Sequence, residues 1–199
     1  MSAFNIEAYL NSLPDDIEEI NVFYKELSYL PDLSRFTNLK YLYCSHNKLV
    51  FLPLLPNSLK YLNCSHNQLV SLPLLPNSLD ELECSGNCLG SLPLLPNLLR
   101  ELFCNFNKLS SLPLLPDSLQ EIWCLGNPIY NIINSDNVNI VKEKVKNLNK
   151  FRLLYYCIKY KRQFRKSLWD VREKKVKEEY RPDRLREMLE GKDINDIDF

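Results

Sequence analysis

Five cysteines at a fixed spacing are the residues of this sequence with the clearest potential for chemistry. They recur every 20 residues, at Cys44, Cys64, Cys84, Cys104 and Cys124. Histidine follows two of them, in Cys44-Ser-His46 and Cys64-Ser-His66. Two cysteines and two histidines could together bind zinc. The alternative is that each thiol is a small apolar group of a protein core, which is how buried cysteines usually behave.

The residues around the cysteines favour the core alternative. In Leu39-Lys-Tyr-Leu42-Tyr-Cys44 the apolar residues alternate with others, which is the periodicity of a β-strand. Cys44 then shares the inward face with Leu42, whereas His46 lies where the strand ends. Stacked positions also have poor geometry for disulfides. We therefore expect free, buried thiols, no metal site and no cofactor.

Few other residues of the sequence could form a catalytic site. The sequence holds two histidines, and both lie in the cysteine repeats, so a Cys/His or Ser/His/Asp arrangement is not favoured. Cys88 and Cys157 stand outside the regular series and are the alternative reactive thiols. The four glycines form no phosphate-binding loop. The sequence therefore predicts a protein that is not an enzyme and has no catalytic residue.

The cysteines belong to a longer repeat, L-x-x-L-x-[LC]-x-x-N-x-L. It begins at residues 39, 59, 79, 99 and 119, and a degenerate copy begins at Ile17, which gives six units. One strand per unit, stacked in parallel at ~4.8 Å, predicts inward columns of Leu and Cys. The Asn at the ninth place is expected to satisfy backbone groups of the loop. Two prolines in Leu-Pro-Leu-Leu-Pro exclude a helix and favour an extended return.

These elements predict an α/β-solenoid, a leucine-rich-repeat arc with an extended convex side. We expect a helical N-terminal cap in residues 1–16, with its helix over 4–13 stopped by Pro14. The solenoid occupies 17–134, and a basic helical cap or tail occupies 135–199. A helix is expected from the capping residues Ser135-Asp136-Asn137 to about Trp169. Its apolar stripe is Val141, Val145, Leu148, Phe151, Tyr155 and Ile158.

Charge is divided between the two ends of the chain. Residues 1–137 carry 7 Lys or Arg and 14 Asp or Glu, a net −7, whereas residues 138–199 carry 18 and 11, a net +7. The start of the sequence has no signal-peptide pattern, and no apolar run is long enough to span a membrane. Seven cysteines without a leader indicate free thiols in a reducing compartment. We therefore expect an intracellular protein.

The string L-P-x-L-P-x-S-L-x-x-L-x-C-S-x-N-x-L resembles the short "LPX" leucine-rich repeats of bacterial effector proteins. Its cysteine-containing form is similar to leucine-rich-repeat proteins of giant DNA viruses of amoebae. The resemblance covers residues 17–129 and implies the solenoid fold. It also implies a virus-encoded protein that acts in the host cytoplasm. Some bacterial relatives carry a ubiquitin-ligase domain after the repeats, so a remnant of such an effector is an alternative. That domain is much longer than residues 135–199, so the resemblance does not carry its activity over.

The outward strand positions are the predicted binding site for a protein partner, on the concave face. Exposed aromatic groups lower solubility unless a partner covers them, and Tyr and Trp are favoured in binding hot spots. The alternative is that strand propensity alone selects these rings. The acidic side chains among them suggest a basic or polar complement. The predicted residues are Tyr41, Tyr43, Tyr61, Asn63, Glu81, Glu83, Glu101, Phe103, Glu121 and Trp123.

A basic run near the C-terminus offers a second function. Tyr160, Phe164 and Trp169 interleave with it, which is compatible with binding nucleic acid or an anionic surface. Two other readings stay open: a solvated helix face, and docking onto the acidic solenoid. The candidate anion-binding residues are Lys159, Lys161, Arg162, Arg165 and Lys166.

Overall fold

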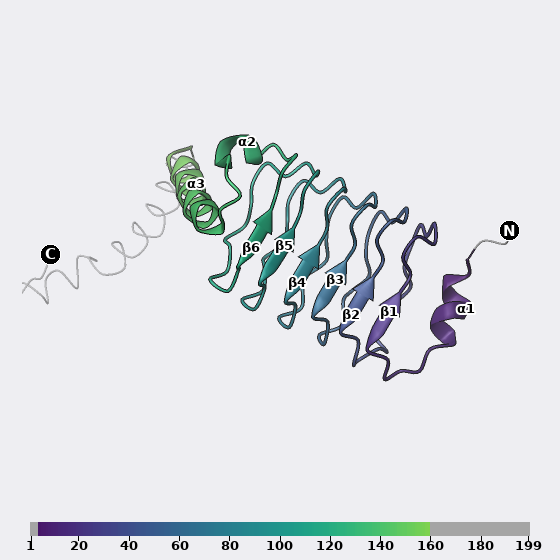
Figure 1. The fold of residues 1–199 in the computed structure, drawn as a ribbon. Helices are drawn as coiled ribbons and strands as arrows, with labels where there is room; N and C mark the ends of the chain where they lie inside the picture. The colour runs from purple at the N-terminus through teal and green to yellow at the C-terminus, as the bar shows by residue number, and fades with distance from the viewer. Residues whose placement is uncertain (1–3, 160–199) are drawn as a thin grey trace, which may run out of the picture. The chain divides into compact units, whose positions relative to one another are not determined.

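Six short parallel strands form one sheet in the computed structural model, which describes residues 4–159 and the side chains of residues 4–153. The sheet order follows the chain, and each strand is three residues long (Figure 1). The chain divides into two compact units, residues 1–150 and 151–199, and the first contains the whole sheet. The strands are β1 (Glu19–Asn21), β2 (Tyr41–Tyr43), β3 (Tyr61–Asn63), β4 (Glu81–Glu83), β5 (Glu101–Phe103) and β6 (Glu121–Trp123).

The sequence repeat sets the strand register. Leu42 pairs with Leu62, Leu62 with Leu82, and Leu82 with Leu102, so the central leucines form one continuous column. The five repeat cysteines are buried within the same core. Each strand residue on either side of the central leucine points away from the core, because successive side chains of a strand face opposite ways. The predicted solenoid with inward columns is confirmed.

The asparagine at the ninth place of the repeat closes the loop after each strand. The Asn67 amide donates to the carbonyl oxygens of Cys44 and Cys64 at 3.0 and 3.1 Å. Its Oδ1 accepts a bond from the backbone N–H of Leu49 at 3.0 Å. Asn87, Asn107 and Asn127 repeat this pattern. The predicted role of these side chains, to satisfy backbone groups of the loops, is confirmed.

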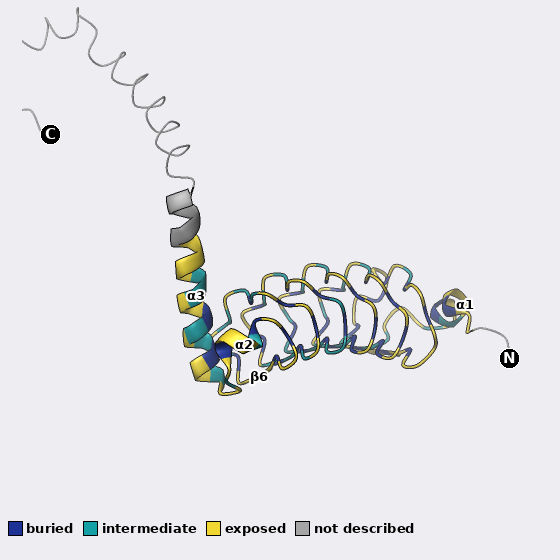
Figure 2. Ribbon diagram, turned by 90° about the horizontal axis from the view of Figure 1, so that it is seen from above, coloured by how far each residue is buried: buried dark blue, intermediate teal, exposed yellow. Residues whose placement is uncertain are grey.

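The second half of each repeat returns without helix or strand, as its prolines predict. Serine hydroxyls join neighbouring returns: Ser58 Oγ donates to the Leu39 carbonyl at 2.8 Å, and Ser118 Oγ donates to the Leu99 carbonyl at 2.6 Å. Buried residues line the inside of the coil and exposed residues the outside (Figure 2). The returns therefore form the side of the solenoid opposite the sheet.

A short helix, α1 (Ile6–Asn11), covers the N-terminal end of the core with Ile6 and Leu10. Asn5 caps it, since its Oδ1 accepts from the Ala8 N–H at 3.0 Å. The helix is shorter than the predicted 4–13 and ends before Pro14, because Ser12 already closes its last turn. The Ser12 hydroxyl donates to the Tyr9 carbonyl at 2.7 Å.

Two helices follow the last repeat. The sequence did not indicate α2 (Tyr130–Ile133), which buries Ile133 completely and ends at Asn134 with a left-handed φ of 44°. One of the three predicted capping residues, Asn137, begins α3 (Val138–Lys159): its Oδ1 accepts from the Asn139 N–H at 3.1 Å. None of the helices among the described residues has the length and apolarity that crossing a membrane requires.

The first half of α3 packs on the last repeat. Val141 and Val145 are buried, and Leu148 packs against the core. Asn149 donates to the Leu112 carbonyl at 3.3 Å. The predicted stripe is wrong at Phe151, which is 69% exposed and is the first residue of the second compact unit. The side chains of Tyr155 and Ile158 lie outside the described ones.

Candidate functional site: the strand face

The outward side chains of β2–β6 form a continuous surface, which we call the strand face. It comprises the ten predicted residues Tyr41, Tyr43, Tyr61, Asn63, Glu81, Glu83, Glu101, Phe103, Glu121 and Trp123. All ten are exposed or half-buried, and each strand places a buried residue between its two outward ones. Parallel pairing brings like positions side by side, for example Glu81 beside Glu101 and Phe103 beside Trp123. The structure therefore gathers all ten on one surface.

Aromatic rings occupy both ends of the strand face. The Tyr61 ring lies 5.0 Å from that of Tyr43 and 6.5 Å from that of Tyr41, between ring centroids. The rings of Phe103 and Trp123 meet edge to face at 6.2 Å. Trp123 remains 53% exposed despite this contact. Such rings offer apolar area that is already held in place by neighbours.

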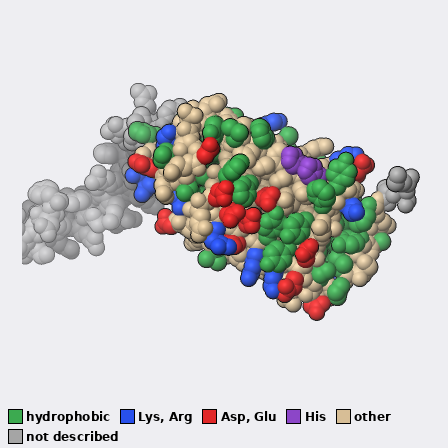
Figure 3. Space-filling model, in the orientation of Figure 1, with side chains coloured by type: hydrophobic (Ala, Val, Ile, Leu, Met, Phe, Trp, Pro, Cys, Tyr) green, Lys and Arg blue, Asp and Glu red, His purple; other side chains and the backbone are tan. Residues whose placement is uncertain are grey.

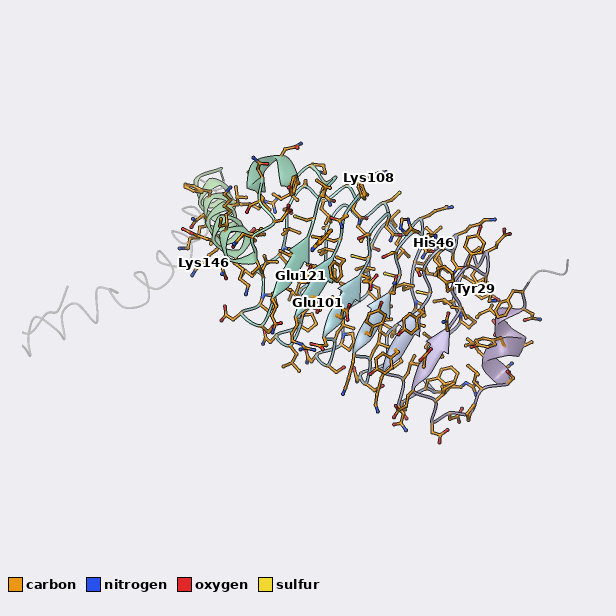
Figure 4. All side chains as sticks on the ribbon, viewed as in Figure 1. Tyr29, His46, Glu101, Lys108, Glu121 and Lys146 are labelled. Carbon is orange, nitrogen blue, oxygen red and sulfur yellow. The ribbon has the colours of Figure 1, made fainter. Side chains whose placement is uncertain are left out.

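Carboxylates occupy the middle of the strand face, where acidic side chains gather over the sheet (Figure 3). Glu101 and Glu121 extend from neighbouring strands (Figure 4). Burial, together with the nearby charges of Glu101 and Glu83, raises the pKa of Glu81. Within the six strands, all in the described part of the chain, no outward position carries Lys or Arg. The carboxylates of the strand face therefore crowd one another; Arg100, just before β5, lies close enough to interact with Glu81 and Glu101 but forms its salt bridge with Asp80.

Glu83 links the acidic and aromatic parts. Its carboxylate accepts bonds from the Tyr61 hydroxyl at 2.5 Å and from the Asn63 amide at 2.8 Å. Burial and this hydrogen bond to Glu83 raise the pKa of Tyr61. The Trp123 indole N–H in turn donates to Glu121 at 2.6 Å. These bonds hold polar groups in fixed positions before any partner arrives, which lowers the entropic cost of binding.

The position two residues after each strand varies in exposure from unit to unit. Ser45 and Ser65 are only 5% and 7% exposed, although the alternation of the strand would direct them outward. A serine is short, so the larger groups around it shield it from solvent. Phe23 and Leu125, at the same place in the first and last units, are 49% and 47% exposed. Ser85 and Asn105, at this place in the two middle units, are half-buried, so the row extends the strand face except at Ser45 and Ser65.

A histidine pair beside the strand face was not predicted. The exposed rings of His46 and His66 stack with centroids 4.3 Å apart, and the Phe23 ring meets His46 edge on at 5.3 Å. Both histidines have a left-handed φ, of 55° and 54°. The recurring Ser-His-Asn could have indicated the pair, since the register copies each ring above the next. His46 lies in the loop after its strand (Figure 4).

The repeat cysteines point inward, as predicted. All five are buried, and the six cysteines with described side chains are free thiols. Burial raises the pKa of Cys44 to about 12 and, together with the charge of Asp136, raises that of Cys124 to about 11. Their thiols are therefore poor nucleophiles. In the described part of the chain no three metal-binding side chains come together.

The remaining predicted residues lie outside this surface. Cys88, one of the two alternative reactive thiols, is half-buried. The side chains of Cys157 and Lys159, and the residues Lys161, Arg162, Arg165 and Lys166, lie outside the described part. Anion binding by the basic run therefore stays a prediction.

Solved structures of bacterial effectors are similar to this chain. A Shigella effector leucine-rich-repeat domain is 34% identical, with a TM-score of 0.54, over 61% of this chain and 53% of the other. The chain thus spans about half the length of that domain. YopM from Yersinia enterocolitica and YopM from Yersinia pestis are 36% and 34% identical over 58% of this chain and 30% and 38% of theirs, each with a TM-score of 0.48.

No protein-family model matches the sequence, and no curated protein matches it. The similar structures support the resemblance to bacterial effector repeats. The resemblance to giant-virus proteins stays an expectation. The six-stranded parallel sheet, the 20-residue repeat and the likeness to the Shigella domain agree. The chain is therefore a leucine-rich-repeat solenoid with the fold of bacterial effector repeat domains.

Proposed function

We propose that this protein is a non-enzymatic interaction module that binds a protein partner through the strand face. The observation that carries the proposal is the row of rings and carboxylates that the register assembles on one side of the sheet. Folding does not need these side chains, since the core lies behind them. The likeness to an effector repeat domain supports a role in protein interaction.

The chemistry of the strand face favours a partner segment with both basic and apolar side chains. A Lys or Arg over β4 and β5 would relieve the crowding of Glu81, Glu83 and Glu101. Apolar side chains of the same segment would cover Tyr43 and Tyr61 at one end or Trp123 at the other. Complementary charge gives specificity and fast association, while the buried rings supply most of the affinity.

The test uses the full chain as bait in affinity purification from host cells, followed by mass spectrometry. The variants Tyr43→Ala, Phe103→Ala and Trp123→Ala are expected to weaken capture of the same partner by at least about tenfold each, the usual effect of a hot-spot residue. Their melting temperatures should stay close to that of the parent, because the side chains lie outside the core. Val70→Ala, a change at a residue 57% exposed in a loop, is the matched control.

A second pair of variants tests the charge complement. Glu81→Gln and Glu101→Gln should slow association and reduce its dependence on salt, since they remove charge and keep shape. If each of the five variants captures the same partner as strongly as the parent does, the proposal is contradicted. Unfolding of the ring variants would show instead that the rings are structural.

Binding of nucleic acid or an anionic surface by residues 159–166 is the second candidate, and the charge of the sequence supports it. Residues 138–199 carry a net +7 against −7 for residues 1–137. Binding should fall steeply with salt, because each neutralised phosphate releases counterions. A mobility-shift assay without binding at low salt would remove this candidate.

A further inference from the structure

Four leucines on the side opposite the sheet form an exposed apolar row, which we call the leucine column. Leu54, Leu74, Leu94 and Leu114 each occupy the middle of a Leu-Pro-Leu-Leu-Pro return. They are 74%, 77%, 80% and 66% exposed. Neighbouring returns are tied together by serine hydrogen bonds and follow the strand register, so the four side chains lie one beside the next.

The fold does not require leucine at these positions. In the same returns Leu52 is buried and Leu55 packs against the core, so the interior is already filled. The middle leucine lies between them and points away from the core. A single exposed leucine is ordinary, but four aligned ones make a contiguous patch of the kind that marks an interaction surface.

The lack of charge on the returns favours a second copy of this chain as the partner of the leucine column. The returns 51–58, 71–78 and 91–98 contain no charged residue, and 111–118 contains only Asp117. A second copy can therefore approach this side without burying opposed like charges. The strand face could not meet a copy of itself in this way, because Glu81, Glu83 and Glu101 would face the same carboxylates. Burying unpaired like charges carries a large penalty.

The even spacing of the leucines also suits a twofold pair. A twofold axis that crosses the leucine column between Leu74 and Leu94 places Leu54 of each copy opposite Leu114 of the other. It likewise places Leu74 of each copy opposite Leu94 of the other. This is the self-complementary contact of a symmetric dimer. A groove of about 390 Å³ lies between the last two returns; it is lined by Leu94, Leu95, Leu114, Leu115 and Pro116, with Asn97 and the charged Asp117. It gives a leucine of the other copy a place to enter.

We propose that two copies of this chain pair back to back through the leucine column. The two strand faces then lie on opposite outer sides of the dimer. Each remains free, and the assembly is bivalent toward a partner that carries two copies of its binding segment. The proposal does not depend on what the strand face binds.

The test is the mass of the full chain in solution, measured by sedimentation velocity from low to high micromolar concentration. A dimer that dissociates on dilution is expected. Leu74→Asn and Leu94→Asn should each weaken it by at least about tenfold, the contribution that a buried leucine makes. Because these residues are 77% and 80% exposed, the melting temperature of the diluted, monomeric variants should match that of the diluted parent.

Two controls separate this surface from the strand face. Leu125→Asn changes a leucine that is 47% exposed beyond β6 and should leave the dimer intact. The Trp123→Ala variant should also form the dimer normally, even if it no longer captures the partner of the strand face. A parent chain that stays monomeric throughout, or a dimer that Leu74→Asn and Leu94→Asn leave unchanged, would overturn the proposal. A monomer that uses the leucine column to bind a different protein would overturn it as well.

Discussion

The repeated asparagines show how one residue type can hold the loops of a solenoid at little cost in chain length. Each amide donates to two strand-end carbonyls and each side-chain oxygen accepts a loop N–H, as at Asn67. These backbone groups are buried, so water cannot replace the bonds. A buried polar group that loses its partner destabilises the fold by ~1–3 kcal/mol.

Asn67→Ala is therefore expected to lower the free energy of unfolding by ~1–3 kcal/mol, because it leaves the buried Leu49 N–H without an acceptor, whereas the Cys44 carbonyl keeps its bond from the Asn47 amide. Urea unfolding followed by circular dichroism measures the change. Asn57→Ala alters an exposed asparagine in a return and serves as the control. Equal stability of the two variants would show that the Asn67 bonds do not matter.

The repeat thiols predict how stability changes in alkali. An unfolded cysteine ionises near its ordinary pKa of 9.0, whereas burial raises the pKa of Cys44 to about 12 and that of Cys124 to about 11. As pH rises above the unfolded value, the unfolded state loses protons that the folded state keeps. The contribution of these thiols is thus complete below about pH 9 and is lost progressively toward pH 11 and 12.

The urea midpoint should accordingly fall between about pH 9 and 11. The Cys124→Ala chain should show a shallower fall than the parent. A thiol reagent should modify the five buried cysteines only after unfolding, at any pH in this range. Rapid modification of all five in the folded protein would contradict their burial.

Among the elements, the three-residue strand is stable only through its neighbours. Each β-strand contributes one fully buried central residue, such as Leu82, and pairs on both sides when it lies inside the sheet. No strand has enough core of its own to fold alone. In such arrays stability is the sum of units and of the contacts between adjacent units.

Leu82→Ala should lower the free energy of unfolding by ~2–5 kcal/mol, the penalty for truncating a buried leucine. Amide hydrogen exchange should speed up in β3 and β5 as well as in β4, because each depends on the next. Lys60→Ala, an exposed change at the start of β3, is the control and should have almost no effect. Faster exchange confined to β4 would argue against coupling between repeats.

At the scale of the whole molecule, the open ends of the core need covers. α1 supplies one with Ile6 and Leu10, and the first half of α3 supplies the other with Val141 and Val145. Lys142 ties that helix to the last repeat by donating to the carbonyls of Asp117 and Leu119 at 2.9 and 2.8 Å. The last repeat therefore depends on α3 as an inner repeat depends on its neighbour.

Val145→Asp should detach this cover, since it places a charge where the structure leaves 2% exposure. The free energy of unfolding is expected to fall by several kcal/mol. Amide hydrogen exchange should become faster first in β6 and then in β5. Glu143→Gln, at an exposed position of the same helix, is the control. A variant whose β6 exchanges as slowly as that of the parent would show that α3 is dispensable for the solenoid.

The repeat by itself determined the strands, their order, their register and the inward columns, with β2–β6 at a period of 20 residues and β1 in a degenerate copy 22 residues before β2. These follow from the sequence because a side chain repeated at a constant interval meets its own copy in the next turn. The same reasoning placed Asn67 in its loop and the ten strand-face residues on one surface. The capping residue Asn137 was equally readable, since it acts on its own helix.

Only the tertiary structure decided features that depend on what a neighbouring turn places alongside. Ser45 is shielded although its strand position points outward, and Tyr61 finds Glu83 on the adjacent strand. The Leu-Pro-Leu-Leu-Pro string has apolar residues on every side, so periodicity could not tell that Leu54 is the one exposed. Exposure and contact across turns are properties of the assembled coil, whereas the period of the sequence fixes only which residues stack on their own copies.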